Sequence, residues 1–597
     1  MFCGLFLLLS VVCSTAETKS SPINLPDSLR GNWLMTDGSN DWVYGFYDNF
    51  VIADNKFWTY EELEGNDKRA KLRLKADDGT KREITVKRQK DGTIRLTAQK
   101  EKTIILSRKK SSSKGYTNPL DSDFTTIFRT DSACLQGYIN GYPSSLGATT
   151  SMIYLNNVLT REDYPTVVNI QPDGRFKAKF KIHYPIFKQW SIQDDHFSNF
   201  YIEPGQTLTL YLEWENMSYN ASKPSESLAM GGESRTNMNL FDAADPIPYN
   251  YREDQQKILN QPPHGYLQYQ MERLQRGQEI LTEYYTHNYI TPKARRLLDN
   301  ELKIAVGYQI LHYRLSREGL VKQFSNNEFI RKPIDSTYYE FLQKMPLNDP
   351  SIVSCRNFDG FVNRFEYIPI FMNQKTIQQN MEEWYFRDSI VATYFHLPPT
   401  LLQDIVKTRN MKYHLNNFTK EEGLVYIDEL CTQLKEPFLR ETVVDIYNRT
   451  QREKEEGYEL PFNKGGEIFR KIIEPFKGKY LFIDFWATTC GPCRAGIESM
   501  ANLRKKYKDS PDLQFIYITS DRESPQKSYD DYIAKNLKGE VSFRISQNDY
   551  NYLRELFRFN GIPRYMLISR EGRILNDNFS AHMLDLTTKE LLQNEKN

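Results

Sequence analysis

The sequence predicts a multidomain chain: two N-terminal antiparallel β domains, an all-α region and a C-terminal α/β domain. Its 597 residues correspond to about four domains of ~150 residues each. Apolar–polar alternations separated by turn dipeptides recur over residues 29–212, which is typical of β strands. Over residues 235–454 the apolar residues recur instead at three- and four-residue steps, which indicates helices. A buried-strand pattern, a turn and an amphipathic helix near residue 490 indicate the α/β domain.

The charge balance is nearly neutral, with 78 basic and 77 acidic residues and a formal net charge of +1. This balance removes any general electrostatic case for binding nucleic acid or an anionic membrane surface. A hydrophobic fraction of 39%, with 13% aromatic residues, is enough to build several cores. Seven cysteines are too few for a disulfide-stabilised scaffold of this length, so each cysteine is interpreted from its own surroundings.

Residues 1–16 have the pattern of a secretory signal peptide. The apolar run over residues 1–12 is too short to span a bilayer, and Ser14 and Ala16 supply small residues for cleavage before Glu17. Lipidation at Cys13 is an alternative, which the lack of a small residue just before it disfavours. No later run reaches 18 apolar residues, so we expect no transmembrane helix after signal removal. We expect an exported protein of the oxidising periplasm or cell envelope.

Residues 17–115 are expected to form a small antiparallel β domain. Alternating segments at residues 71–74, 83–86 and 94–96 are separated by Asp-Gly turns at 78–79 and 91–92. Aromatic side chains in strands are more often core than sugar-stacking surface, so we interpret those of this region as core. They are Trp33, Trp42, Tyr44, Phe46, Tyr47, Phe57, Trp58 and Tyr60.

Residues 116–230 are expected to form a β-sandwich-like domain, and residues 231–455 a helical domain. The first carries strand patterns at 135–139, 167–170, 176–182 and 206–212. In the second, Thr291-Pro292 and the capping box at residues 419–422 predict helix starts. Cys355 and Cys431 have no metal-like spacing, so we interpret them as buried free thiols, with a disulfide between them as the alternative.

The last region, residues 456–597, carries a Cys-x-x-Cys motif. Residues 480–486 have the pattern of a buried strand, and Cys490-Gly491-Pro492-Cys493 follows it and opens a helix. A helix N-terminus presents free N–H groups and partial positive charge, which favour a thiolate. Cys490 is therefore the expected nucleophile. Cys493, one turn further in, is expected to stay a thiol until it resolves a mixed disulfide.

Two other uses of this pair are disfavoured. A structural zinc needs four ligands, and no second Cys-x-x-Cys or His pair follows Cys493, since His582 is the only later histidine; we therefore expect no metal. A peroxide-reducing thiol of the peroxiredoxin kind would need a Pro-x-x-x-Thr/Ser-x-x-Cys frame. Asp484 and Ala487 occupy the neighbourhoods of its Pro and Thr.

The run from Asp484-Phe485-Trp486-Ala487 through Cys490 to Cys493 resembles the thioredoxin active site. The longer spacing that follows resembles the TlpA/ResA branch of exported thiol-disulfide oxidoreductases. The resemblance covers residues 460–597 and implies a C-terminal thioredoxin fold. Strand and helix patterns at 513–519, 529–535, 541–545, 550–557 and 565–569 are in the matching order. Residues 201–206, Tyr-Ile-Glu-Pro-Gly-Gln, resemble a phrase in β-sandwich modules ahead of envelope thioredoxin-like domains.

The resemblance implies roles for two further catalytic residues. The Ile562-Pro563 bond should be a cis peptide facing the disulfide, where its backbone can pair with an extended client segment. Asp484 matches the family's buried carboxylate. Burial would raise its pKa and suit it to carry the proton of Cys493.

The resemblance also implies a substrate-binding surface made of Trp486, Gly491, Pro492 and Ile562. Thr489 departs from the family pattern, because a tryptophan is usual there. Client choice therefore does not carry over from thioredoxin.

The function expected from these features is reduction of protein disulfides through a redox-active Cys490–Cys493 disulfide, with no other cofactor. A Gly-Pro insert accompanies reducing couples in this family. Partners would be disulfide-containing client proteins and a membrane dithiol that donates electrons. The alternative is an envelope binding or scaffold protein that uses its thioredoxin-like domain for docking.

Overall fold

The computed structural model describes residues 25–98, 101–193, 196–218, 227–372, 381–415 and 418–594. The proposed signal peptide and Cys13 lie outside these residues. The chain divides into two compact units, residues 1–116 and residues 117–597, and each is described by itself. Among the described helices, none is long and apolar enough to cross a membrane.

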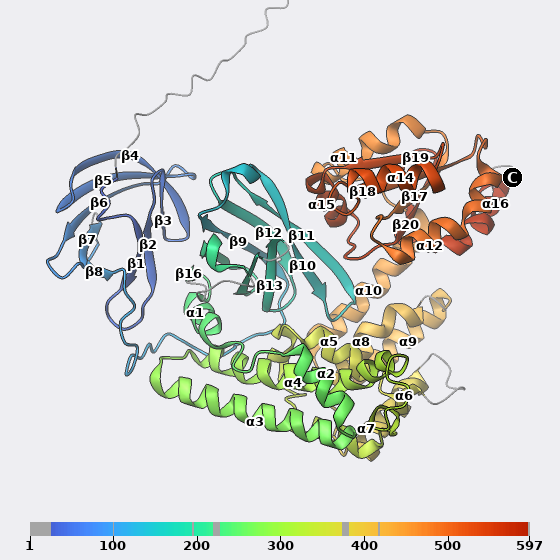
Figure 1. The fold of residues 1–597 in the computed structure, drawn as a ribbon, viewed down its shortest axis with the longest axis horizontal. Coiled ribbons are helices and arrows are strands. Elements are labelled where there is room, and N and C mark those ends of the chain that lie inside the picture. Colours follow the sequence, from blue (N-terminus) through green and yellow to red (C-terminus); the bar gives the residue numbers. More distant parts are fainter. Residues whose placement is uncertain are drawn as a thin grey trace, which may run out of the picture. The chain divides into compact units, whose positions relative to one another are not determined.

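The first unit is a closed barrel of eight antiparallel strands (blue in Figure 1), in which each strand pairs with the next and β1 closes the ring against β8. β5 shows why the chain folds this way, because its alternate residues Ala70, Leu72, Leu74 and Ala76 are buried and those between them are not. The strands are β1 (Gly31–Met35), β2 (Trp42–Phe46), β3 (Phe50–Ala53), β4 (Lys56–Asn66), β5 (Arg69–Ala76), β6 (Lys81–Arg88), β7 (Ile94–Ala98) and β8 (Ile104–Ser107).

The aromatic residues of this unit are mainly core. Trp33, Trp42, Tyr44, Phe46 and Trp58 are all buried, which confirms for them the interpretation as core. Tyr47, Phe57 and Tyr60 are half-buried. The barrel therefore buries most of its aromatic surface instead of presenting it to a ligand.

The second unit begins with one continuous eight-stranded sheet, in the order β14-β13-β10-β11-β12-β9-β15-β16. Its strands are β9 (Asp131–Asn140), β10 (Thr149–Asn157), β11 (Glu162–Ile170), β12 (Arg175–Ile182), β13 (Ile186–Gln193), β14 (His196–Ile202), β15 (Thr207–Glu213) and β16 (Leu228–Met230). The expected antiparallel sandwich needs two corrections. All eight strands belong to a single sheet, and β9 pairs with β15 in parallel. Gly137 permits that pairing, because a Cβ there would lie 2.1 Å from the carbonyl oxygen of Leu210.

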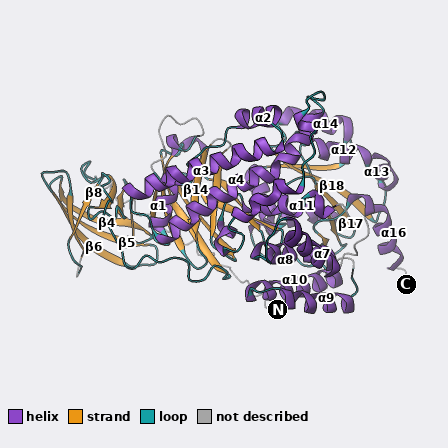
Figure 2. Ribbon diagram, turned by 90° about the horizontal axis from the view of Figure 1, so that it is seen from below, coloured by secondary structure: helices purple, strands orange, loops and turns teal. Residues whose placement is uncertain are grey.

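A helical region follows, and its two long helices α3 and α4 lie side by side (Figure 2). The predicted starts are confirmed: Thr291 accepts a hydrogen bond from the N–H of Ala294, and Thr419 and Glu422 form the capping box of α9. The helices are α1 (Ser234–Ala243), α2 (Tyr251–Asn260), α3 (Pro263–His287), α4 (Pro292–Val321), α5 (Phe358–Glu366), α6 (Pro369–Met372), α7 (Met381–Tyr394), α8 (Leu401–Leu415), α9 (Lys420–Gln433) and α10 (Pro437–Glu456).

The free-thiol interpretation of Cys355 and Cys431 is confirmed, and no disulfide joins them. Cys355 is buried, as expected, whereas Cys431 is half-buried. Burial raises the pKa of both thiols, which lowers the thiolate fraction at neutral pH.

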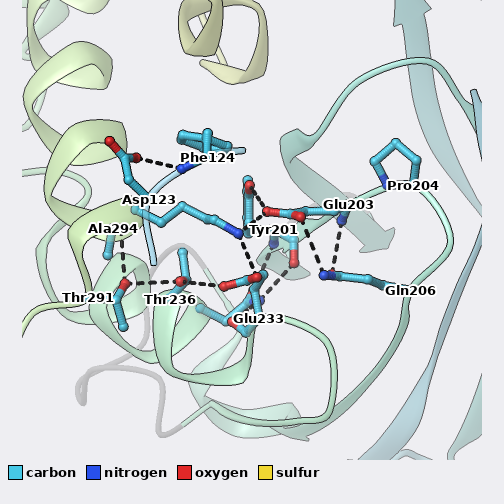
Figure 3. Close-up of polar contacts among 12 residues, drawn as sticks. Asp123, Phe124, Tyr201, Glu203, Pro204, Gln206, Glu233, Thr236, Thr291 and Ala294 are labelled. Atoms are coloured by element: carbon cyan, nitrogen blue, oxygen red, sulfur yellow. Dashed lines mark hydrogen bonds and ion pairs between the residues drawn. The ribbon is translucent and has the colours of Figure 1, made fainter. Parts of the chain in front are cut away.

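A buried ion cluster joins the sheet to the helices (Figure 3). Lys293 of α4 donates to Glu203 and to Glu233, each at 2.6 Å, and its side chain is 8% exposed. Tyr201 and Gln206 also donate to the carboxylate of Glu203. Three residues of the 201–206 segment thus have a structural role. Glu203 pairs with the buried Lys293, and Tyr201 and Gln206 donate hydrogen bonds to the carboxylate of Glu203.

The chain ends in an α/β domain with a five-stranded sheet, in the order β19-β18-β17-β20-β21. Its strands are β17 (Tyr480–Phe485), β18 (Leu513–Ser520), β19 (Val541–Ile545), β20 (Arg564–Ile568) and β21 (Ile574–Asn576). Its helices are α11 (Lys464–Ile473), α12 (Gly491–Ser499), α13 (Ala501–Tyr507), α14 (Gln526–Asn536), α15 (Gln547–Leu556) and α16 (Leu584–Asn594). β17 to β19 run parallel, whereas β20 is antiparallel to β17.

The central strand β17 separates two cores. Leu481, Ile483 and Phe485 belong to the core that contains residues of α11 and α15. The side chains of Phe482 and Trp486 belong instead to the core that contains Cys493 and Ile497 of α12. All residues of β17 are buried, as expected for a central strand with helices on both faces. The structure thus has a β-rich N-terminal part, a helical middle and a C-terminal α/β domain, as the sequence predicts.

Candidate active site

The two cysteines of the Cys-x-x-Cys motif form a disulfide where the loop after β17 enters α12. Cys490 is the N-cap residue of α12, and its Sγ accepts a hydrogen bond of 3.1 Å from the backbone N–H of Cys493. Pro492 lies in the first turn, where its missing N–H costs no helical hydrogen bond. When the pair is reduced, the same N–H and the helix dipole would stabilise a thiolate on Cys490.

The two sulfurs differ in accessibility. Cys490 is half-buried beside the exposed residues Thr489, Gly491 and Pro492, whereas Cys493 is fully buried. A disulfide from outside the domain can therefore approach Cys490 and not Cys493. This asymmetry suits Cys490 for attack and Cys493 for resolving the mixed disulfide from inside.

The loop before β20 lies against the disulfide. The Ile562-Pro563 peptide bond is cis, and the carbonyl oxygen of Ile562 lies 3.8 Å from the Sγ of Cys490. The register of β17 with β20 brings these distant segments together, because Phe485 pairs with Arg564. Both residues of the cis bond are half-buried, so their backbone borders the approach to Cys490.

Asp484 lies in β17, six residues before Cys490, and is completely buried. Strand alternation directs its side chain to the same face as Phe482 and Trp486, which is the face that packs on α12. Neither of its carboxyl oxygens has a hydrogen-bond partner. Burial raises the pKa of Asp484 well above its usual 3.8, and the charge of Arg504 only partly opposes this. A buried carboxylate of raised pKa is a stronger base than an exposed carboxylate.

Trp486 requires a correction. The sequence placed it on the substrate-binding surface, but its side chain is 0% exposed. Its ring packs against Tyr532, with centroids 5.0 Å apart, and against Tyr529. Trp486 is therefore a core residue beneath the cysteine loop, because helices pack over the end of the central strand that it follows. Gly491, Pro492 and Ile562 keep positions next to the disulfide.

Sequence reasoning missed a supporting loop at residues 520–524. The hydroxyl of Thr489 donates to the carbonyl oxygen of Glu523 at 3.3 Å. The N–H of Thr488 donates to Ser524 Oγ at 2.9 Å, and Ser524 is itself buried. The polar run Ser520-Asp521-Arg522-Glu523-Ser524 directly after a buried strand was the available signal, because residues at the carboxyl ends of neighbouring parallel strands meet at one sheet edge.

The described residues hold no cluster of three or more His, Cys, Asp or Glu side chains that could bind a metal. The reactive groups that the described residues bring together at this site are the two cysteines. An accessible sulfur at a helix N-terminus, a buried partner sulfur and a cis-proline loop define a thioredoxin-like redox site.

Comparison with known proteins supports this class. Residues 478–574 match the thioredoxin-like family, so the C-terminal domain is thioredoxin-like. Thiol-disulfide oxidoreductase ResA of Bacillus thuringiensis is 27% identical over 140 residues, which are 23% of this chain and 76% of that protein. Thioredoxin-like protein YneN of Bacillus subtilis is 29% identical over 126 residues, which are 21% of this chain and 68% of that protein.

Other similarities are likewise confined to part of the chain. Probable nucleoredoxin 1 of Arabidopsis thaliana is 24% identical over 106 residues, which are only 18% of its own length and 18% of this chain. The solution structure of a putative thiol-disulfide oxidoreductase from Bacteroides vulgatus is 28% identical and covers 20% of this chain and 78% of that chain, with a TM-score of 0.18. All of these matches lie in the C-terminal part of the chain, and these relatives do not describe the regions before it.

Proposed function

We propose that this protein is an exported reductase of protein disulfides. The observation that carries the proposal is the disulfide itself: an accessible Cys490 at the N-terminus of α12, a buried Cys493 behind it and the carbonyl of Ile562 beside it. The thiol-disulfide oxidoreductases among the relatives match the same part of the chain. The pattern of residues 1–16 supports export, with lipidation of Cys13 as the less favoured route to the envelope.

The reaction begins with the reduced dithiol. The thiolate of Cys490 attacks one sulfur of a client disulfide, forms a mixed disulfide and displaces the other client sulfur as a thiolate, which takes up a proton. Cys493 then loses its proton and attacks the Sγ of Cys490. The client leaves as a dithiol and the Cys490–Cys493 disulfide forms. Two electrons pass to the client in each cycle, and a dithiol donor, proposed to be a membrane protein, must return them.

Asp484 is proposed to accept the proton of Cys493 during the second step. It is buried on the strand face that packs on α12, and burial raises its pKa, which makes its carboxylate a better proton acceptor than an exposed one. Gly491, Pro492 and the Ile562-Pro563 backbone are proposed to contact the client, because they border the accessible sulfur.

Insulin-disulfide reduction tests the proposal. The chain beginning at Glu17 should precipitate insulin chains with dithiothreitol as electron donor, and Cys490→Ser should reduce the rate to that of dithiothreitol alone. Cys431→Ser is the matched control, because it removes a half-buried free thiol outside the site and should leave the rate unchanged. If wild type and Cys490→Ser are equally inactive, the proposal is wrong and a docking role is favoured.

A further inference from the structure

Arg554, on α15 of the thioredoxin-like domain, bonds to three separate segments. Its guanidinium donates to Glu523 Oε1 at 2.6 Å, to the carbonyl oxygen of Asn560 at 3.3 Å and to the hydroxyl of Tyr154 at 3.1 Å. Tyr154 belongs to β10 of the eight-stranded sheet, roughly 400 residues earlier in the chain. None of these contacts was visible in the sequence.

The guanidinium is held in a fixed position. The side chain of Arg554 is 8% exposed, and the rings of Tyr550 and Phe559 lie 5.2 and 5.7 Å from its central carbon. Burial alone would lower the pKa of Arg554, but Glu523, Tyr550 and Tyr154 together outweigh this effect, so the pKa is raised. A buried arginine with a rigid fork of donors fixes the spacing of the groups it binds.

One of those groups supports the cysteine loop. Glu523 uses its side chain for Arg554 and its backbone carbonyl for the hydroxyls of Thr489, at 3.3 Å, and Thr488, at 3.5 Å. Thr489 directly precedes Cys490. A displacement of Glu523 would therefore also displace Thr489, the residue next to the nucleophile.

A second group supports the cis-proline loop. The carbonyl of Asn560 binds Arg554, and its side-chain amide donates to Asn156 of β10 at 2.9 Å. Ile562, whose carbonyl lies 3.8 Å from Cys490 Sγ, is two residues further on. Arg554 thus holds both loops that flank the disulfide, and β10 holds one of them directly.

Hydrogen bonds between α15 and the eight-stranded sheet fix the position of the helix that carries Arg554. Asn548 accepts hydrogen bonds from the hydroxyl of Thr149 and from the N–H of Thr150, and Glu555 accepts from the N–H of Val167 at 2.8 Å. Two of these three bonds are donated by backbone N–H groups of β10 and β11. The sheet therefore binds the helix that carries Arg554 along its length.

We propose that Arg554 is a positioning residue for disulfide exchange with protein clients, and that Tyr154 of the eight-stranded sheet shares this role. Together they set the spacing of the two loops between which an extended client segment must fit beside Cys490. The inference rests on the proposed reductase function and extends it, because it gives the sheet before the thioredoxin-like domain a part in the reaction.

The inference predicts a split between two kinds of substrate. A small disulfide such as 5,5′-dithiobis(2-nitrobenzoate) needs only an accessible, reactive Cys490. A protein disulfide also needs both loops at the right distance, and a misplacement of about 1 Å can cost up to ~100-fold in rate. Loss of Arg554 should therefore slow protein substrates selectively.

The experiment uses the chain beginning at Glu17 and compares Arg554→Met, Arg554→Lys and Tyr154→Phe with wild type. Arg558→Met is the matched control, because Arg558 is exposed and its guanidinium lies over the ring of Tyr164 in the same interface. For each variant, kcat/KM with insulin, the rate of the reduced protein with the small disulfide, and the midpoint of thermal unfolding are measured.

We expect Arg554→Met to lower kcat/KM with insulin by about tenfold and to leave the small-disulfide rate within about twofold of wild type. The kcat/KM of Arg554→Lys with insulin should lie between those of wild type and Arg554→Met, since lysine keeps the positive charge but lacks the planar set of donors. Tyr154→Phe should show a smaller decrease of the same kind, and Arg558→Met none.

Equal loss with both substrates, or no loss with either, would overturn the inference. Tyr154→Phe removes only a hydroxyl, so it still tests the inference if Arg554→Met does not fold. If Tyr154→Phe reduces insulin as fast as wild type, the shared role of Tyr154 is wrong. Failure of the proposed function is distinct, because wild type itself would then react with the small disulfide and not with insulin.

Discussion

Replacing Asp484 with asparagine should change how the stability of the thioredoxin-like domain depends on pH. Burial raises the pKa of this carboxyl well above 3.8 in the folded protein. Below pH 3.8 both the folded and the unfolded chain hold the proton. Above it the unfolded chain releases the proton and the folded chain keeps it, so the free energy of unfolding falls as pH rises towards the folded pKa.

The magnitude follows from proton linkage. Between pH 5 and pH 6 the wild type should lose up to about 1.4 kcal/mol from this group, the limit that is reached when the folded chain keeps the proton throughout, and asparagine loses nothing there because it does not titrate. The buried amide of Asp484→Asn leaves polar atoms without partners, at a cost of about 1–3 kcal/mol. That cost is the same at both pH values. The change with pH of the difference between the two proteins therefore isolates the titration.

Hydrogen-exchange mass spectrometry of peptides covering β17 measures the free energy of opening of this sheet. The oxidised proteins are compared at pH 5 and pH 6, with rates corrected for the intrinsic effect of pH. Asp531→Asn, at an exposed carboxylate on α14, controls for the loss of a carboxylate from the same domain. The reasoning is refuted if the stability of wild type relative to Asp484→Asn is unchanged, or increases, from pH 5 to pH 6.

Two further outcomes follow from the described contacts. Lys293→Met should destabilise the second unit by about 3–5 kcal/mol, because it leaves Glu203 and Glu233 without their shared cation; a thermal midpoint equal to wild type in calorimetry would show that the cluster is not stabilising. Cys493→Ser should accumulate mixed disulfides between Cys490 and client proteins, because the resolving sulfur is missing. Mass spectrometry that finds Cys490 alkylatable but no client attached would contradict the division of roles.

The sequence was most informative where structure depends on neighbouring residues. The capping box at Thr419 and the helix start at Thr291 are confirmed, since a cap needs only the first turn of its own helix. The alternation in β5 predicted its buried face for the same reason. The position of Cys490 at a helix N-terminus also follows from adjacent residues, and the structure shows it there.

The tertiary structure decided what depends on segments far apart in the chain. The strands of the eight-stranded sheet could be identified one by one, but the parallel pairing of β9 with β15 could not, because a strand pattern does not specify its partner. Trp486 was misplaced for a similar reason, since the helices that cover it come from other parts of the domain.

For the active site, the sequence by itself determined the reactive pair and its class of chemistry, because Cys490 and Cys493 are one helical turn apart. Only the fold decided what surrounds them. It set Ile562 3.8 Å from the nucleophile and used Arg554 to join both flanking loops to Tyr154 of the sheet. The residues in these contacts are between about 6 and about 400 positions apart in the sequence. No local sequence pattern specifies such pairs, because the packing of the second unit brings them together.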